Sequence, residues 1–170
     1  MHRQPFNKSW NRRHCLLSLA AALALAGCGG ADTPPDVGYT LLDGRQTTLH
    51  AQRGKVLLVN FWATSCTTCV AEMPHLIANH QALKGKPFDT LAVAMSYDPP
   101  DYVAEFAKTR ALPFGVAIDN TGKVAEAFGG VKLTPTTFLL DPQGRIVKRY
   151  VGQPDFDALR REIDQLLPKA

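Results

Sequence analysis

The chain has 170 residues, of which 45% are hydrophobic and 20% charged, so its composition is that of a globular protein and excludes a disordered one. This length accommodates one ordinary domain with its own core. The net charge of +4 comes entirely from residues 1–27, which hold four of the 19 bases and no acid, so residues 28–170 carry 15 bases against 15 acids. Because residues 28–170 have no net charge, the composition gives no support to a nucleic-acid partner.

Residues 1–27 have the order of a secretory signal peptide. A basic start precedes an apolar run over residues 15–27, and small residues close the run. These 13 residues are fewer than the roughly 20 that a permanent membrane-spanning helix requires. The sequence therefore predicts export, with the segment removed from the mature protein.

The signal ends in residues 25–28, Leu-Ala-Gly-Cys, which resemble the lipobox of bacterial lipoproteins. The resemblance implies that Cys28 is lipidated and anchors the mature chain to a membrane. The alternative is an ordinary cleaved signal with a chance cysteine. The residue after Cys28 is Gly29, and a residue other than Asp at this position resembles the Gram-negative lipoproteins that are sorted to the outer membrane. Residues 28–38, rich in Gly and Pro, predict a flexible tether before a folded domain over residues 39–170.

The folded domain is expected to alternate strands and helices. It opens with a hairpin over residues 39–50, then an apolar run over 55–63 that suits a central buried strand, then a helix over 65–84. Strands are further expected at 89–98, 115–118, 136–141 and 145–151, and helices at 99–111, 123–128 and 155–167. This order predicts an α/β fold with a central mixed β-sheet flanked by helices on both faces and an N-terminal β-hairpin extension.

Two cysteines, Cys66 and Cys69, are the only thiols expected in the exported domain, since Cys15 leaves with the signal and Cys28 is lipidated. Thiols two residues apart can form a redox-active disulfide, hold a soft metal ion, or supply half of a structural zinc site. A closed zinc site commonly draws four ligands from two such pairs, and the sequence holds no second pair.

The cysteines fall where the central strand ends and its helix begins. Unpaired amides and the helix dipole favour an anion there, so the amides of Thr68 and Cys69 are expected to stabilise a thiolate on Cys66, with Ser65 as the N-cap. Such a setting lowers a thiol pKa from about 8.5 to roughly 3.5–7.5. Cys69 lies deeper and is expected to stay protonated until it attacks a mixed disulfide on Cys66.

Glu72 follows Cys69 by three residues, so on a helix its carboxylate lies one turn from that sulfur. A partly buried carboxylate there would have a raised pKa and could accept the proton of Cys69. The alternative is a solvated surface glutamate.

The segments LVNFWATSC and TPTTFLLDPQGRIV resemble the TlpA/ResA-type thioredoxin-like proteins, relatives of the AhpC/TSA proteins, over about residues 37–167. The resemblance implies a thioredoxin-like fold and a membrane-tethered thiol–disulfide oxidoreductase with Cys66 attacking and Cys69 resolving. It implies a cis-proline at Pro135, which would free the backbone of Thr134 to pair with an extended substrate, and Trp62 as a further substrate contact. The alternative for Pro135 is an ordinary trans proline entering a strand.

The predicted function is that of a monomeric disulfide reductase on the periplasmic side of a bacterial membrane. Its expected partners are disulfides of exported proteins, among them apocytochrome c during cytochrome c maturation, and a membrane thiol carrier as reductant. No cofactor or metal is expected beyond the Cys66–Cys69 disulfide. An oxidase using the same residues, a Cu(I) carrier and a thiol peroxidase remain as alternatives.

Overall fold

The structure, a computed structural model, describes residues 33–168. The predicted signal peptide, the lipid anchor Cys28 and the first part of the tether lie outside these residues. No helix between residues 33 and 168 combines the length and apolarity that crossing a membrane would take. The elements in chain order are β1 (Gly38–Thr40), β2 (Gln46–Thr48), η1 (His50–Gln52), β3 (Val56–Trp62), α1 (Thr67–Ala82), β4 (Phe88–Ala94), α2 (Pro100–Thr109), β5 (Gly115–Ile118), α3 (Lys123–Ala127), β6 (Thr136–Leu140), β7 (Ile146–Val151) and α4 (Phe156–Leu166).

A five-stranded sheet in the order β5-β4-β3-β6-β7 forms the centre of the fold. Strands β3, β4 and β5 run parallel, and β6 and β7 are antiparallel to their neighbours, so the predicted mixed sheet is confirmed. β3 lies in the middle of the sheet, and all seven of its residues are buried, as its almost unbroken apolar run predicts.

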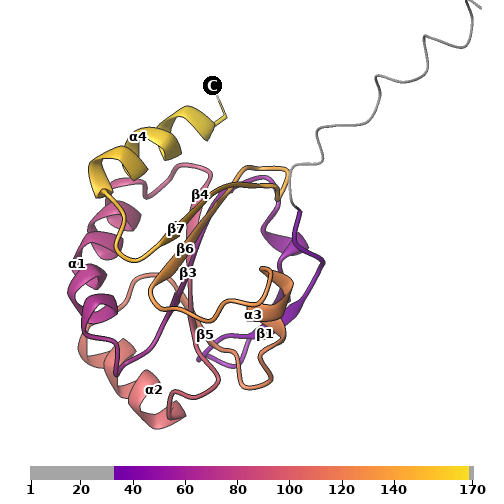
Figure 1. The fold of residues 1–170 in the computed structure, drawn as a ribbon. Coiled ribbons are helices and arrows are strands. Elements are labelled where there is room, and N and C mark those ends of the chain that lie inside the picture. The colour runs from indigo at the N-terminus through magenta and orange to yellow at the C-terminus, as the bar shows by residue number, and fades with distance from the viewer. Residues whose placement is uncertain (1–32, 169–170) are drawn as a thin grey trace, which may run out of the picture. The chain divides into compact units, whose positions relative to one another are not determined.

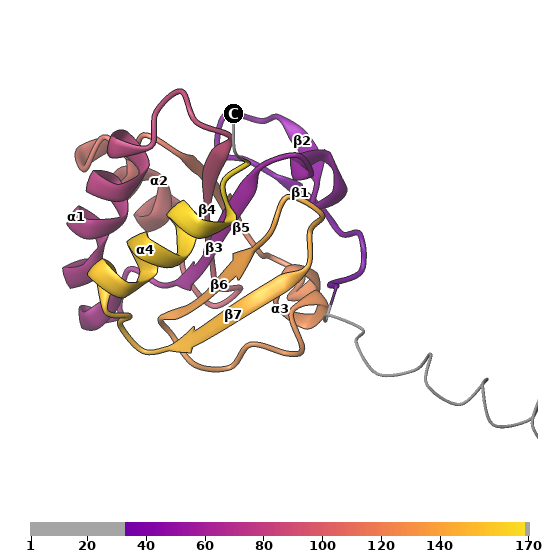
Figure 2. The ribbon, with the colours of Figure 1, turned by 90° about the horizontal axis from the view of Figure 1, so that it is seen from above.

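Helices and hairpin divide between the two faces of the sheet. α1, α2 and α4 cover one face, and α3 with the N-terminal hairpin covers the other (Figures 1 and 2). Because successive strand residues point to opposite faces, β3 feeds both cores: Leu58 and Trp62 pack with the three helices, and Val59 and Phe61 pack under α3 and the hairpin.

The predicted N-terminal hairpin is present as β1 paired antiparallel with β2, although each strand is only three residues long. The chain leaving β1 then reaches the outer edge of β5, where the N–H of Leu42 donates to the carbonyl of Val116 at 2.9 Å. The hairpin therefore covers an edge that would otherwise expose unpaired backbone groups.

The largest difference from the expected elements is at the end of β4. The strand stops at Ala94, four residues before the predicted end at Asp98. The chain turns there, with the N–H of Asp98 bonded to the carbonyl of Met95, and the Asp98 side chain is buried against the segment that precedes α1.

Candidate active site

The two cysteines lie where β3 has ended and α1 begins, and they form a disulfide with their Cα atoms 5.2 Å apart. Cys66 is the N-cap residue of α1, and the backbone N–H of Cys69 donates to Cys66 Sγ at 3.2 Å. The expectation that Ser65 caps the helix is wrong, because the sulfur of Cys66 occupies the capping position itself.

The two sulfurs differ in access. Cys66 is half-buried, whereas Cys69 is completely buried. The backbone N–H groups of Thr68 and Cys69 were both expected to stabilise the Cys66 sulfur, and the structure places the N–H of Cys69 within hydrogen-bonding distance of it. A helix start favours negative charge at its capping position, which Cys66 occupies, and Cys66 is also the more accessible of the two sulfurs.

Glu72 lies one turn beyond Cys69 on α1, and no part of it is exposed. The alternative of a solvated surface glutamate is therefore wrong. Burial raises the pKa of the Glu72 carboxyl to about 7, although a hydrogen bond from Asn60 acts to lower it. A group that titrates near neutrality is suited to take up and release a proton in the working pH range.

Asn60 is a site residue that the sequence reasoning missed. Its Nδ2 atom donates to Glu72 Oε1 at 2.7 Å and to Thr137 Oγ1 at 2.9 Å, and all three residues are fully buried. Asn60 and Thr137 are direct partners in the register of β3 with β6. The available signal was a single polar residue within an apolar strand, because a buried amide requires partners.

Pro135 reaches the same end of the sheet as the cysteines. Thr136 at the start of β6 pairs with Phe61 near the end of β3, so the residues just before Thr136 lie beside the start of α1. The Thr134–Pro135 peptide bond is cis, as the resemblance implies. Thr134 is half-buried, and its Oγ1 lies 3.5 Å from the hydroxyl of the exposed Tyr97.

Trp62, the third residue expected to contact substrate, is completely buried at the end of β3. Its ring packs on Phe106 of α2 at 5.0 Å between centroids, and its Nε1 has no hydrogen-bond partner among the described residues. In this state Trp62 presents no surface to a substrate and supports the site from beneath.

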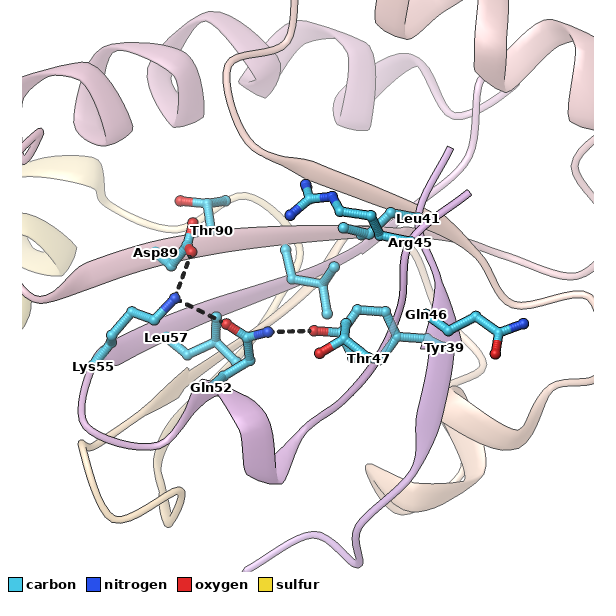
Figure 3. A pocket seen from close by; sticks show the side chains of 12 residues that line it. Tyr39, Leu41, Arg45, Gln46, Thr47, Gln52, Lys55, Leu57, Asp89 and Thr90 are labelled. Carbon is cyan, nitrogen blue, oxygen red and sulfur yellow. Dashed lines mark hydrogen bonds and ion pairs between the residues drawn. The ribbon is translucent and has the colours of Figure 1, made fainter. Parts of the chain in front are cut away.

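A cavity of about 400 Å³ lies at the other end of the sheet, between the hairpin and the beginnings of β3 and β4 (Figure 3). Lys55 lies beside it, paired with Asp89 at 3.0 Å and bonded to Gln52, which in turn bonds to the hydroxyl of Tyr39. β3 spans about 20 Å, so this cavity is separate from the disulfide. Within residues 33–168, no group of three or more His, Cys, Asp or Glu side chains is placed to hold a metal ion.

Comparison with known proteins identifies relatives with the same chemistry. Residues 30–167 match the model of the Redoxin family. The thiol-disulfide oxidoreductase ResA of Geobacillus thermodenitrificans is 32% identical over 136 residues, which cover 80% of this chain and 77% of that protein.

Solved structures agree on the fold. A protein of Neisseria meningitidis described as a thioredoxin is 40% identical, with a TM-score of 0.74, over 80% of this chain and 90% of that one. The exposed lipoprotein thioredoxin Etrx1 of Streptococcus pneumoniae is 25% identical, with a TM-score of 0.68, over 77% of this chain and 99% of that one. Since a family model spans most of the chain and a ResA protein matches its cysteine-bearing domain, the chain belongs to the Redoxin family, as a thiol–disulfide oxidoreductase of the ResA type.

Proposed function

We propose that the protein is a disulfide reductase of exported proteins, acting as a monomer on the periplasmic side of a bacterial membrane. The observation that carries this proposal is the unequal burial of the two sulfurs, with a buried carboxyl one turn beyond the deeper one. An accessible thiolate backed by a sheltered thiol and a base is the arrangement that a two-step thiol exchange needs.

The proposed reaction starts from the reduced pair. The Cys66 thiolate attacks one sulfur of a substrate disulfide, forming a mixed disulfide and releasing the other substrate sulfur as a thiolate. Glu72 then takes the proton of Cys69, and the Cys69 thiolate attacks Cys66 Sγ. This step releases the second substrate sulfur and closes the Cys66–Cys69 disulfide, so the substrate gains two electrons that the pair has lost.

The oxidised pair must then be reduced again. We propose a membrane thiol carrier as the source of these two electrons, with apocytochrome c among the disulfide substrates. No cofactor other than the cysteine pair takes part in the proposed cycle. Substrate would lie along Thr134 and Pro135, where an extended chain can pair with the backbone beside the disulfide.

The direction of the reaction is tested by the reduction potential of the pair. Trp62 is the only tryptophan after residue 28 and lies four residues before Cys66, so its fluorescence should report the redox state. The processed protein is titrated against a thiol/disulfide buffer. A potential below about −230 mV supports a reductase, and one near −120 mV contradicts it in favour of an oxidase.

We further propose that Cys28 carries the lipid that holds the domain at the membrane, with the outer membrane as the destination. Similarity to a lipoprotein thioredoxin supports this proposal. The test is metabolic labelling with a fatty acid in a Gram-negative host, followed by membrane fractionation. Label should appear on the wild-type protein and not on Cys28→Ala, and label on neither would contradict the anchor.

A further inference from the structure

Three buried polar side chains meet beneath the cysteine pair, on the face of the sheet that α1 covers. Asn60, Glu72 and Thr137 are each 0% exposed and are surrounded by the apolar core. Burying polar groups is costly unless they are hydrogen-bonded, so a cluster of this kind requires a physical reason.

The amide of Asn60 joins the other two residues. One Nδ2 atom serves both Glu72 Oε1 and Thr137 Oγ1, which uses both of its N–H groups. Because Thr137 is the direct partner of Asn60 across β3 and β6, the amide is held by the sheet and not by a flexible loop. It therefore presents a fixed donor to the carboxyl of a residue on α1.

The two oxygens of Glu72 are consequently different. Oε1 accepts the bond from Asn60, whereas Oε2 is buried and has no hydrogen-bond partner among the described residues. An oxygen without a donor has its lone pairs available, so Oε2 is the atom at which a proton can be taken up.

We propose that Asn60 is a positioning residue for Glu72: it fixes Oε1 and thereby leaves Oε2 as the atom that accepts the proton of Cys69. This inference rests on the proposed role of Glu72 in the second step of the reaction. The proton moves from Cys69 Sγ to Oε2, the Cys69 sulfur forms its bond to Cys66, and the departing substrate thiolate is protonated by solvent.

The hydrogen bond also keeps the base usable. Burial raises the pKa of the Glu72 carboxyl, and the Asn60 bond opposes that rise because it stabilises the charged form. Without this donor a larger fraction of the carboxyls would hold a proton at neutral pH, and fewer could accept one from Cys69. Asn60 thus lowers the pH at which Cys69 can be activated.

The test replaces the donor and follows the carboxyl directly. Asn60→Leu keeps the branched shape and the number of heavy atoms of the side chain but has no donor, and Thr90→Val serves as the matched control. Thr90 is likewise a buried strand residue, on β4, and its hydroxyl lies 3.3 Å from Nδ1 of His80. In the reduced protein, the Glu72 pKa is measured by carboxyl 13C NMR, and resolution of a mixed disulfide on Cys66 is timed across pH 5–9.

For Asn60→Leu we expect the Glu72 pKa to rise by about one unit. Resolution should slow by about tenfold at pH 6 and recover at alkaline pH, where the carboxyl ionises despite the change. Thr90→Val should leave both the pKa and the pH profile as in the wild type. A stable Asn60→Leu protein with an unchanged pKa and profile would overturn the proposal and leave Asn60 a purely structural residue.

A measurement on the wild-type protein tests the proposal even if Asn60→Leu fails to fold. The side-chain NH2 resonances of Asn60 should shift with the same midpoint as the Glu72 carboxyl, since one of these hydrogens bonds to it. Resonances that stay constant through that midpoint would overturn the proposal.

Glu72→Gln separates this inference from the function on which it rests. If Glu72→Gln resolves mixed disulfides with the wild-type pH profile, the base role of Glu72 is wrong. If Glu72→Gln loses the profile while Asn60→Leu retains it, only the positioning role of Asn60 is wrong.

Discussion

Asp98 accepts two hydrogen bonds from Thr64, one from its backbone N–H at 2.7 Å and one from its hydroxyl at 2.5 Å. Thr64 lies two residues before Cys66, and Asp98 lies in the loop after β4, so this pair ties that loop to the segment that carries Cys66. Bonds to a carboxylate are the stronger kind, and Asp98 is only 3% exposed.

Asp98→Ala should therefore lower the free energy of unfolding by about 3 kcal/mol, because it leaves two donors of Thr64 without their partner. Denaturant titration measures this loss. Asp101→Ala, at an exposed position on α2, is the control and should change stability by less than about 0.5 kcal/mol. Equal effects of the two changes would contradict the bracing role of Asp98.

Cys69→Ser should trap substrates on the protein. The variant retains the accessible Cys66 and lacks the sulfur that would displace a bound substrate, so a mixed disulfide should persist. Mass spectrometry after mixing with a disulfide peptide measures the adduct. Cys66→Ser should form little adduct, because Cys69 is fully buried; comparable trapping by both variants would contradict the assigned order of attack.

Glu72 should make the protein less stable as pH rises. Its folded pKa of about 7 exceeds its ordinary 4.5, so the folded state binds the proton more tightly than the unfolded state does. Stability from this group is complete below about pH 4.5, falls between about pH 4.5 and 7, and is lost above that range. The loss should be about 3 kcal/mol.

The measurement for Glu72 is the free energy of unfolding of the wild type and of Glu72→Gln at pH 5 and pH 8. Taking the difference between the two proteins cancels the contributions of other titrating groups. The wild type should lose stability relative to the variant as pH rises. A difference that stays constant across this range would show that Glu72 titrates normally.

Asp155 is the N-cap of α4, and its carboxylate accepts bonds from the N–H groups of Asp157 and Ala158. Asp155→Ala should cost about 1 kcal/mol of stability, and Asp155→Ser should cost less because serine also caps. Thermal unfolding compares the two variants. Equal losses would indicate that the hydrogen bonds of the cap contribute little.

Most of the fold could be predicted because it depends on local patterns. The strand at residues 115–118 was predicted with the bounds that it has, and the central strand to within one residue at each end, since apolar runs mark buried strands. The predicted strand at 89–98 was too long because its last residues also look strand-like. β4 ends in a turn that is stabilised by hydrogen bonds between Asp98 and Thr64. Thr64 is 34 residues away in the sequence, so no local pattern could indicate this contact.

In the candidate active site, too, local relationships could be predicted from the sequence and long-range contacts could not. Cys66, Cys69 and Glu72 could be placed relative to one another because they share one helix, on which sequence spacing determines direction. Asn60 could not be assigned a role, because its partners Glu72 and Thr137 are 12 and 77 residues away in the sequence. Only the folded sheet brings Asn60 and Thr137 together.

The division of the apolar residues into two cores on opposite faces of the sheet has a consequence for how this protein can evolve. The cysteine pair, Trp62 and Glu72 all belong to the side covered by α1, α2 and α4. Substitutions under α3 and the hairpin can therefore change thermal stability without altering a side chain packed directly against Cys69 or Glu72, except where they reach β3, whose residues enter both cores.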